Sequence, residues 1–191
     1  MKIGITGSIG CGKSVVIDYL KNNGFKTYDA DRISYELTQK GNVCYNMIIN
    51  CFGDEILDEE KNIIRAKLGN IIFNDKNKKK ELENIIHPYV KEEIESIEDD
   101  LAFVEVPLLY ESNMENLFDK IIVVACDFDI QIARIMKRNN ISYEDAVNRI
   151  NNQMPLAEKI KRADYVIYNN GSLDEVWLDI DKILKGVIIW N

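Results

Sequence analysis

The sequence has 191 residues, of which 46% are hydrophobic and 29% are charged, a composition typical of one globular domain. Its formal net charge of −8 argues against sequence-independent binding of nucleic acid, which requires a basic surface. No apolar run approaches the roughly 18 residues of a membrane span, and the N-terminus lacks the features of a signal peptide. We therefore expect a cytoplasmic protein with neither nucleic acid nor membrane as a partner, and the sequence carries no signal for an oligomeric state.

The first hundred residues predict two strands and a helical region. In chain order the elements are a strand at 2–6, a helix at 13–22, a strand at 25–28 and helical patterns over 32–73. An apolar period close to 3.6 residues then runs from Leu82 to Ile97 and is interrupted by Pro88. Because the residue before a proline avoids the α region, we expect one helix to stop near Ile86 and another to start at Pro88, with His87 at the junction.

The second half of the chain predicts three more strands alternating with helices. The elements are a strand at 101–105, a strand at 120–125, two helices flanking 139–141, a strand at 165–168 and a last helix after 172. Ser142 and Ser172 are suited to cap the helices that follow them. Strands alternating with helices predict an α/β fold with a doubly wound, parallel five-stranded sheet. Ligands of such sheets bind at the carboxyl ends of the strands.

A glycine-rich octet between the first strand and the first helix matches the P-loop pattern Gly-x-x-x-x-Gly-Lys-Ser. Its backbone N–H groups and the N-terminus of the next helix suit phosphate oxygens. Lys13 is expected to reach the β and γ phosphates, and the Ser14 hydroxyl to bind Mg²⁺. The residues expected to surround the nucleotide phosphates are Gly7, Gly10, Cys11, Gly12, Lys13, Ser14 and Val15.

A basic segment stands out in this acidic chain. Residues 131–162 carry three acidic side chains and seven basic ones, which are Arg134, Lys137, Arg138, Arg149, Lys159, Lys161 and Arg162. A local basic surface on an acidic protein indicates a small polyanionic ligand.

The four cysteines form no Cys-x-x-Cys pair, and the single histidine is distant from all of them in sequence. We therefore expect no zinc site, and we interpret Cys44 and Cys51 as buried thiols. Cys11 lies beside a helix N-terminus, which lowers thiol pKa values. It is either an oxidisable thiol or a tolerated small residue, and the second reading is favoured.

Seven segments together resemble the dephospho-CoA kinase family nearly end to end. In chain order they are "GITGSIGCGKS", "YDADRISYEL", "RAKLGNIIF", "LENIIHPYV", "EVPLLYE", "QIARIMKRN" and "ADYVIYNNG". The resemblance implies Mg²⁺- and ATP-dependent phosphorylation of the ribose 3′-hydroxyl of dephospho-CoA, the last step of coenzyme A synthesis. It also implies one P-loop kinase domain, with a core of about 1–30, 101–130 and 163–191, a helical substrate region of about 31–100, and a lid of about 131–162.

The resemblance assigns roles in the phosphoryl transfer to four side chains. Asp31 is expected to be the catalytic base, although the residues alone favour equally the alternative that Asp29 and Asp31 merely cap the next helix. Glu105 stands where the family usually has Asp and is expected to hold Mg²⁺. Arg138, with Lys13, is expected to stabilise charge on the transferring phosphoryl group. The family commonly follows this arginine with Asp, whereas the present chain has Asn139.

The remaining predicted contacts concern the acceptor and the adenine. The resemblance implies that Arg65 and His87 bind the dephospho-CoA substrate, with His87 at a helix N-terminus. Asn169 and Asn170 follow the last strand and are expected to read the adenine edge by amide hydrogen bonds. The family often has Asp at the position of Tyr168.

Three alternative functions share the octet. A small P-loop kinase acting on a nucleoside or nucleoside monophosphate would not predict the Asp-Ala-Asp, His-Pro and Val-Pro-Leu-Leu segments together. A GTP-binding switch generally carries Asn-Lys-x-Asp, which the sequence lacks. A non-catalytic ATP-binding module would need neither Asp31 nor the basic segment.

Overall fold

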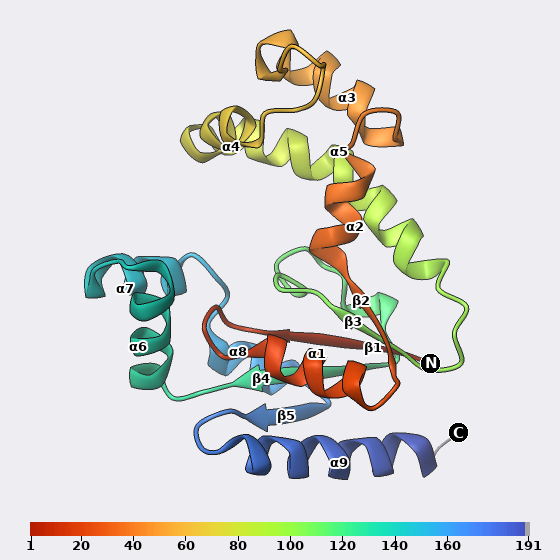
Figure 1. The fold of residues 1–191 in the computed structure, drawn as a ribbon, viewed down its shortest axis with the longest axis vertical. Coiled ribbons are helices and arrows are strands. Elements are labelled where there is room, and N and C mark those ends of the chain that lie inside the picture. The colour runs from red at the N-terminus through yellow and green to blue at the C-terminus, as the bar shows by residue number, and fades with distance from the viewer. Residues whose placement is uncertain (190–191) are drawn as a thin grey trace. The chain divides into compact units, whose positions relative to one another are not determined.

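The computed structural model describes residues 1–189 and contains a five-stranded sheet flanked by helices (Figure 1). The strands are β1 (Lys2–Gly7), β2 (Lys26–Asp29), β3 (Ala102–Glu105), β4 (Lys120–Ala125) and β5 (Tyr165–Tyr168). They lie in the order β2-β3-β1-β4-β5. β1 is central and pairs in parallel with β3 and β4, and β4 pairs in parallel with β5. The predicted doubly wound α/β fold is confirmed.

The chain divides into two compact units. The first comprises Met1–Tyr28 and the chain from Glu98 onward, and the second comprises Asp29–Ile97. Besides the sheet, the first unit holds α1 (Lys13–Asn22), η2 (Glu115–Leu117), α6 (Phe128–Asn139), α7 (Tyr143–Asn151), α8 (Leu156–Arg162) and α9 (Leu173–Ile189). The second unit holds α2 (Ala30–Leu37), α3 (Val43–Phe52), η1 (Asp54–Ile56), α4 (Arg65–Asn74) and α5 (Lys76–Glu95). No helix within residues 1–189 is both long and apolar enough to cross a membrane.

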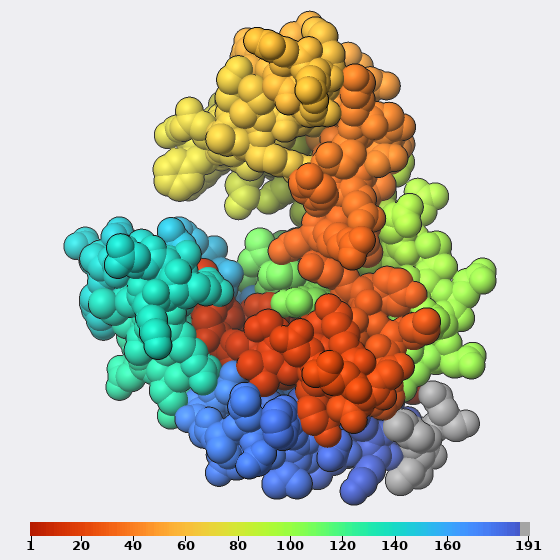
Figure 2. All heavy atoms as spheres, in the orientation of Figure 1, coloured from red at the N-terminus to blue at the C-terminus, as the bar shows by residue number. Residues whose placement is uncertain are grey.

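The core of the first unit lies between the sheet and helices α1 and α9. The buried apolar side chains of this layer include Ile3, Ile5, Val16, Leu20, Phe103, Ile122, Val124, Ile167, Ile180 and Leu184. α8 packs against β4, and Figure 2 shows the α9 helix along one edge of the unit. Val187, near the end of α9, is also buried in the core, whereas Trp190 and Asn191 lie outside the described residues.

Two of the predicted helix caps are present. The Ser142 hydroxyl accepts a hydrogen bond from the Asp145 N–H at 3.1 Å. At the start of α9 the Ser172 N–H donates to a Glu175 carboxylate oxygen at 3.0 Å, and the Glu175 N–H donates back to the Ser172 hydroxyl at 3.4 Å. Local hydrogen bonds of this kind are specified by a few neighbouring residues, which is why the sequence pattern was sufficient to find them.

The predicted break at His87 is wrong. α5 is one helix from Lys76 to Glu95, and it contains Pro88 in its interior. Proline removes one backbone donor and crowds the preceding turn. The buried residues on either side of it, however, are Ile86, Val90 and Ile94. This apolar face continues through the proline, and its packing outweighs the local defect. His87 therefore lies in mid-helix and has no helix N-terminus beside it.

The N-terminus of α5 is stabilised by Asp75, whose carboxylate accepts hydrogen bonds from the N–H groups of Asn77 and Lys78 at 2.8 and 3.2 Å. We expect Asp75→Ala to lower the free energy of unfolding by about 1 kcal/mol, because two terminal donors lose their acceptor. Asp75→Asn retains the acceptor and serves as the control. Urea unfolding followed by circular dichroism measures both, and equal loss in the two variants would contradict a capping role.

Candidate active site

The turn between β1 and α1 requires glycine at two positions where its backbone lies close to neighbouring groups. Gly12 has φ 86° and ψ 38°, in the left-handed region, and a Cβ there would lie 2.2 Å from the Asn169 amide nitrogen. At Gly7 a Cβ would lie 2.3 Å from the carbonyl oxygen of Val124 on β4. Both glycines therefore permit a close approach that any side chain would prevent. The predicted P-loop is a tight turn pressed against its neighbours.

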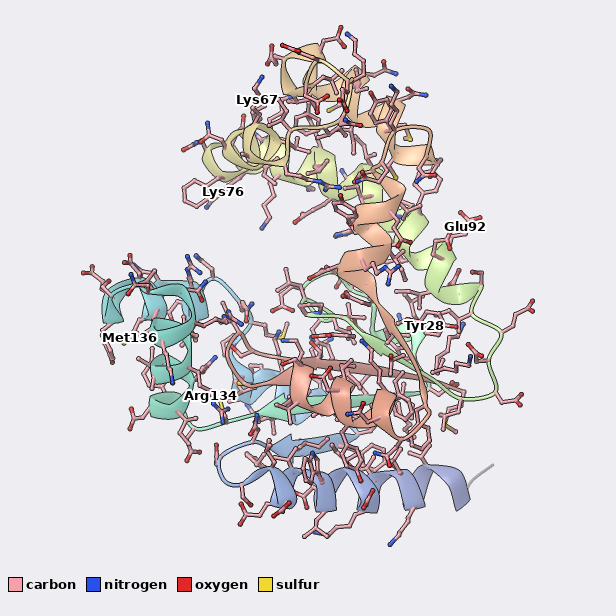
Figure 3. All side chains as sticks on the ribbon, in the orientation of Figure 1. Tyr28, Lys67, Lys76, Glu92, Arg134 and Met136 are labelled. Atoms are coloured by element: carbon pink, nitrogen blue, oxygen red, sulfur yellow. The ribbon has the colours of Figure 1, made fainter. Side chains whose placement is uncertain are left out.

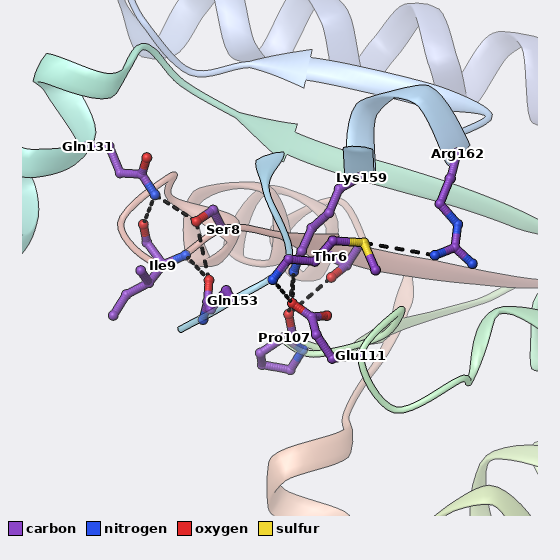
Figure 4. Close-up of polar contacts among 10 residues, drawn as sticks. Thr6, Ser8, Ile9, Pro107, Glu111, Gln131, Gln153, Lys159 and Arg162 are labelled. Carbon is purple, nitrogen blue, oxygen red and sulfur yellow. Dashed lines mark hydrogen bonds and ion pairs between the residues drawn. The ribbon is translucent and has the colours of Figure 1, made fainter. Parts of the chain in front are cut away.

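Two glutamines hold the first half of this loop (Figure 4). The Gln131 amide donates to the Ser8 hydroxyl and to the Ile9 carbonyl, each at 2.7 Å. The Gln153 side-chain oxygen accepts from the Ile9 N–H at 2.9 Å and from the Ser8 hydroxyl at 3.2 Å. Sequence reasoning missed both residues, because their partners are more than 120 residues away along the chain and no local pattern marks them.

Asn169 holds the second half of the loop. Its side-chain N–H donates to the Cys11 carbonyl at 2.9 Å, and its side-chain oxygen accepts from Arg134 at 3.3 Å. Asn170 instead exchanges hydrogen bonds with Asp127 at 2.7 and 2.9 Å. Both amides are thus already engaged within the protein. The expected contact with an adenine edge stays a prediction, and the observed role of Asn169 is to position the loop.

A cavity of about 580 Å³ opens over the loop and is lined by Gly10, Gly12, Val15, Arg134, Lys137, Arg138, Asn169, Gly171 and Leu173. Its three cations come from α6, whose atoms lie beside those of the first residues of the chain in Figure 2. Figure 3 labels Arg134 on that helix, and its buried Nη1 is without a hydrogen-bond partner among the described residues. Three cations around a P-loop make this cavity suited to a polyphosphate.

Arg138 makes a contact that bears on the replacement of the family's Asp by Asn139. Its Nε donates to the Asn139 side-chain oxygen at 3.1 Å. The amide therefore still accepts from the arginine, although it contributes no charge. The side chain of Arg138 is exposed at the cavity, where a bound anion would meet it.

Ser14 and Glu105 follow or end neighbouring strands, since the P-loop joins β1 to the helix that holds Ser14 and Glu105 ends β3. Ser14 lies in the first turn of α1 and is exposed, whereas Glu105 is the last residue of β3 and is partly buried. In the sheet register Glu105 lies opposite Ile5, two residues before the P-loop begins. The described residues contain no group of three or more His, Cys, Asp or Glu that would hold a metal by themselves. A hydroxyl and a carboxylate fit Mg²⁺, which takes few protein ligands and shares substrate phosphates.

The turn after Glu105 is fixed from two directions, as Figure 4 shows. The Pro107 carbonyl accepts from the Thr6 hydroxyl at 3.2 Å and from the Lys159 ammonium at 3.4 Å. Lys159 is fully buried and forms an ion pair with Glu111 at 2.8 Å. A buried cation with these partners ties α8 to the turn that follows β3. Sequence reasoning counted Lys159 only as part of the basic segment.

Asp29 and Asp31 differ in their local roles. One carboxylate oxygen of Asp29 accepts from the N–H groups of Asp31 and Arg32, at 2.9 and 3.2 Å, and so caps α2. Asp31 lies in the first turn of that helix, just beyond the end of β2. Of the two capping candidates, Asp29 is therefore the residue that caps.

Arg65 and His87 belong to the second unit, with Asp31. Arg65 donates to the Tyr35 carbonyl at 3.2 Å and to the Thr38 hydroxyl, and its guanidinium lies 4.5 Å from the centre of the Tyr35 ring. Partial burial lowers the pKa of His87 below its ordinary value. The imidazole is therefore neutral at pH 7 and can take part in hydrogen bonds without carrying a charge.

Residues 1–175 match the family model described as dephospho-CoA kinase. Dephospho-CoA kinase from Oceanobacillus iheyensis is 42% identical, with 99% of this chain and 97% of the relative covered. The enzyme of the same name from Fusobacterium nucleatum is 41% identical, with 98% of each chain covered.

Two solved structures are also similar to this chain. Dephospho-CoA kinase from Campylobacter jejuni is 35% identical, with a TM-score of 0.72 over 98% of each chain. Shikimate kinase from Acinetobacter baumannii, at 15% identity and a TM-score of 0.57, shares the fold. By a family match that spans most of its length and by relatives at about 40% identity, this chain belongs to the dephospho-CoA kinase family of phosphotransferases.

Proposed function

We propose that the protein transfers the γ-phosphoryl group of ATP to the ribose 3′-hydroxyl of dephospho-CoA, giving CoA and ADP. The observation that supports this most directly is the cavity in which the P-loop glycines meet three cations of α6. The choice of acceptor is supported by the family and by the similar proteins, which are named dephospho-CoA kinase.

On the donor side, the P-loop and Lys13 bind the phosphates, and Arg138 neutralises charge on the transferring group. Phosphoryl transfer depends on positioning and electrostatic stabilisation more than on covalent chemistry by the protein. Arg138 is suited to this role because it is exposed at the cavity and carries a permanent charge. We propose that residues 131–162 act as the lid that brings these cations to the nucleotide.

Mg²⁺ would be held by the Ser14 hydroxyl and by Glu105, the latter through water. When bound, the ion neutralises charge on the nucleotide phosphates. The hydrogen bonds of Thr6 and Lys159 to Pro107 support this role, because they fix the turn that follows Glu105.

On the acceptor side, Asp31 orients the ribose hydroxyl and accepts its proton. Asp31 lies in the first turn of α2, next to the cap that Asp29 provides and just beyond the end of β2. Arg65 supplies a cation for a phosphate of the acceptor, and neutral His87 a hydrogen bond. We also propose that the protein works in the cytoplasm, where thiols such as its four free cysteines stay reduced.

The acceptor is tested by offering the purified protein Mg-ATP with dephospho-CoA, adenosine, AMP or no acceptor, and by following ADP. We expect ADP release to depend on dephospho-CoA, and mass spectrometry to show CoA as the product. Equal release with and without dephospho-CoA would contradict the proposal. Faster turnover with adenosine or AMP would favour a nucleoside or nucleoside monophosphate kinase.

We expect Asp31→Asn to lower kcat by about 10²-fold or more while ATP binding stays near normal, because the amide cannot accept the proton. Glu36→Gln, which changes an exposed carboxylate on the same helix, is the matched control and should retain activity. Steady-state kinetics and nucleotide titration measure both quantities. Near-full turnover by Asp31→Asn would remove this residue from the mechanism.

We expect Arg138→Ala to lower kcat by about 10²-fold or more, because its charge acts chiefly in the transition state. Lys137→Ala, which removes the neighbouring cation of the same helix and cavity, should cost less. The same kinetic assay compares the two variants. If Arg138→Ala weakened only ATP affinity and left kcat intact, the transition-state role would be wrong.

A further inference from the structure

The P-loop cysteine lies against a second cysteine. The Sγ atoms of Cys11 and Cys126 are 3.2 Å apart, and both side chains are buried. Cys11 follows β1 and Cys126 follows β4, and these strands are neighbours in register, with Gly7 opposite Val124. The sheet therefore brings the two thiols together although 115 positions separate them.

We propose that Cys11 and Cys126 are a disulfide-forming pair, oxidised by a peroxide, and that this bond switches off the nucleotide site. The inference rests on the proposed function, because it assigns the regulation of the same P-loop. Disulfides in reducing compartments are usually transient and redox-sensing.

The geometry requires only a small movement to form the bond. A disulfide has an S–S length of about 2.05 Å, so the two sulfur atoms must approach by roughly 1 Å. Cys11 stands between Gly10 and Gly12, both with positive φ (82° and 86°). Glycines on both sides give the loop backbone freedom to shift.

Cys126 also borders a second cavity, of about 400 Å³, whose walls include Phe128, Gln131, Gln153 and Leu156. Hydrogen peroxide is little larger than water, and a cavity of this size admits it. The cavity lies on the side of the two glutamines that hold Ser8 and Ile9. It therefore provides a route to Cys126, whose sulfur lies 3.2 Å from that of Cys11, and this route is distinct from the cavity that we assign to ATP.

The chemistry balances with hydrogen peroxide as the two-electron oxidant. One thiol attacks a peroxide oxygen, so that an S–O bond forms, the O–O bond breaks and one water leaves. The second thiol attacks the resulting sulfenic acid sulfur, so that the S–S bond forms, the S–O bond breaks and a second water leaves. Two thiols and one peroxide thus give one disulfide and two waters.

The electrostatics of the pair agree with this chemistry. The hydrogen bond from the Cys126 thiol lowers the pKa of Cys11 against the opposing effect of burial, and the charge of Lys13 lowers it further. The same hydrogen bond, with burial, raises the pKa of Cys126. Of the two thiols, Cys11 is therefore the one that loses its proton more readily, and thiolate is the reactive form.

The bond would act on the nucleotide site because Cys11 is part of the P-loop. Its carbonyl accepts the Asn169 hydrogen bond, and Asn169 in turn accepts from Arg134 at the ATP cavity. A shift of Cys11 by about 1 Å disturbs both contacts. Misplacement of this size in an active site costs about 10²-fold in rate.

The test treats the full-length protein with hydrogen peroxide, blocks remaining thiols by alkylation and digests with trypsin without reductant. We expect the tryptic peptides Ile3–Lys13 and Ile121–Arg134 to be linked, with a loss of about 2 Da relative to the two free thiols. Cys44 and Cys51 share the peptide Gly41–Lys61, so a bond between them would be recognised separately.

Activity and binding of a fluorescent ATP analogue are measured on the same samples. We expect oxidation to lower activity by about 10²-fold, and dithiothreitol to restore it. Cys126→Ser and Cys126→Ala should keep basal activity and resist peroxide, whereas the matched control Cys51→Ser should lose activity as the wild type does. Two different substitutions at Cys126 are used so that the test can still be read if one variant does not fold.

Three results would overturn the proposal: no linked peptide, a linked protein that binds the ATP analogue normally, or Cys126 variants inactivated as fast as the wild type. The peptide map and the ATP analogue do not depend on the acceptor. If reduced protein failed to phosphorylate dephospho-CoA while the linked form lost nucleotide binding, the proposed acceptor would be wrong. The proposal that the Cys11–Cys126 bond switches off the nucleotide site would still be supported.

Discussion

A P-loop is a sharp backbone turn, and its polar groups need partners that the turn itself cannot provide. Here Gln131, Gln153 and Asn169 supply them. Each of these side chains comes from the second half of the chain; the two glutamines contact Ser8 and Ile9, and Asn169 contacts Cys11. Because buried backbone groups left without partners are costly, the shape of the loop depends on α6 and on the segments that follow α7 and β5.

α6 carries both a side chain that holds the loop and cations that line the cavity over it. Gln131, Arg134 and Arg138 are spaced by three and four residues, so they share one face of the helix. Gln131 holds the loop, while Arg134 and Arg138 line the cavity. A movement of α6 would change the support of the loop and the positions of its cations together. This coupling favours the lid proposal for residues 131–162.

Much of the fold could be predicted because its signals are local. The helix at residues 13–22 and the strand at residues 120–125 have the predicted bounds, since a glycine turn, an apolar run and a cap each act within a few residues. The prediction of a helix break at Pro88 was wrong for the opposite reason. Local strain from proline predicted an end to the helix, whereas packing along one apolar face carries α5 through it.

The amino-acid sequence by itself determined the order of strands and helices, the P-loop and the resemblance to one kinase family, because these depend on short-range geometry and on motifs. Only the tertiary structure decided which side chains hold the loop, that Asn169 bonds Cys11, and that Lys159 is a buried partner of Glu111. It also brought Cys11 to Cys126. These contacts join residues far apart in the chain, and no periodicity or spacing encodes them. From the sequence, Cys11 is interpreted as a tolerated small residue, and its contact with Cys126, which follows β4, is what makes it a candidate for redox control.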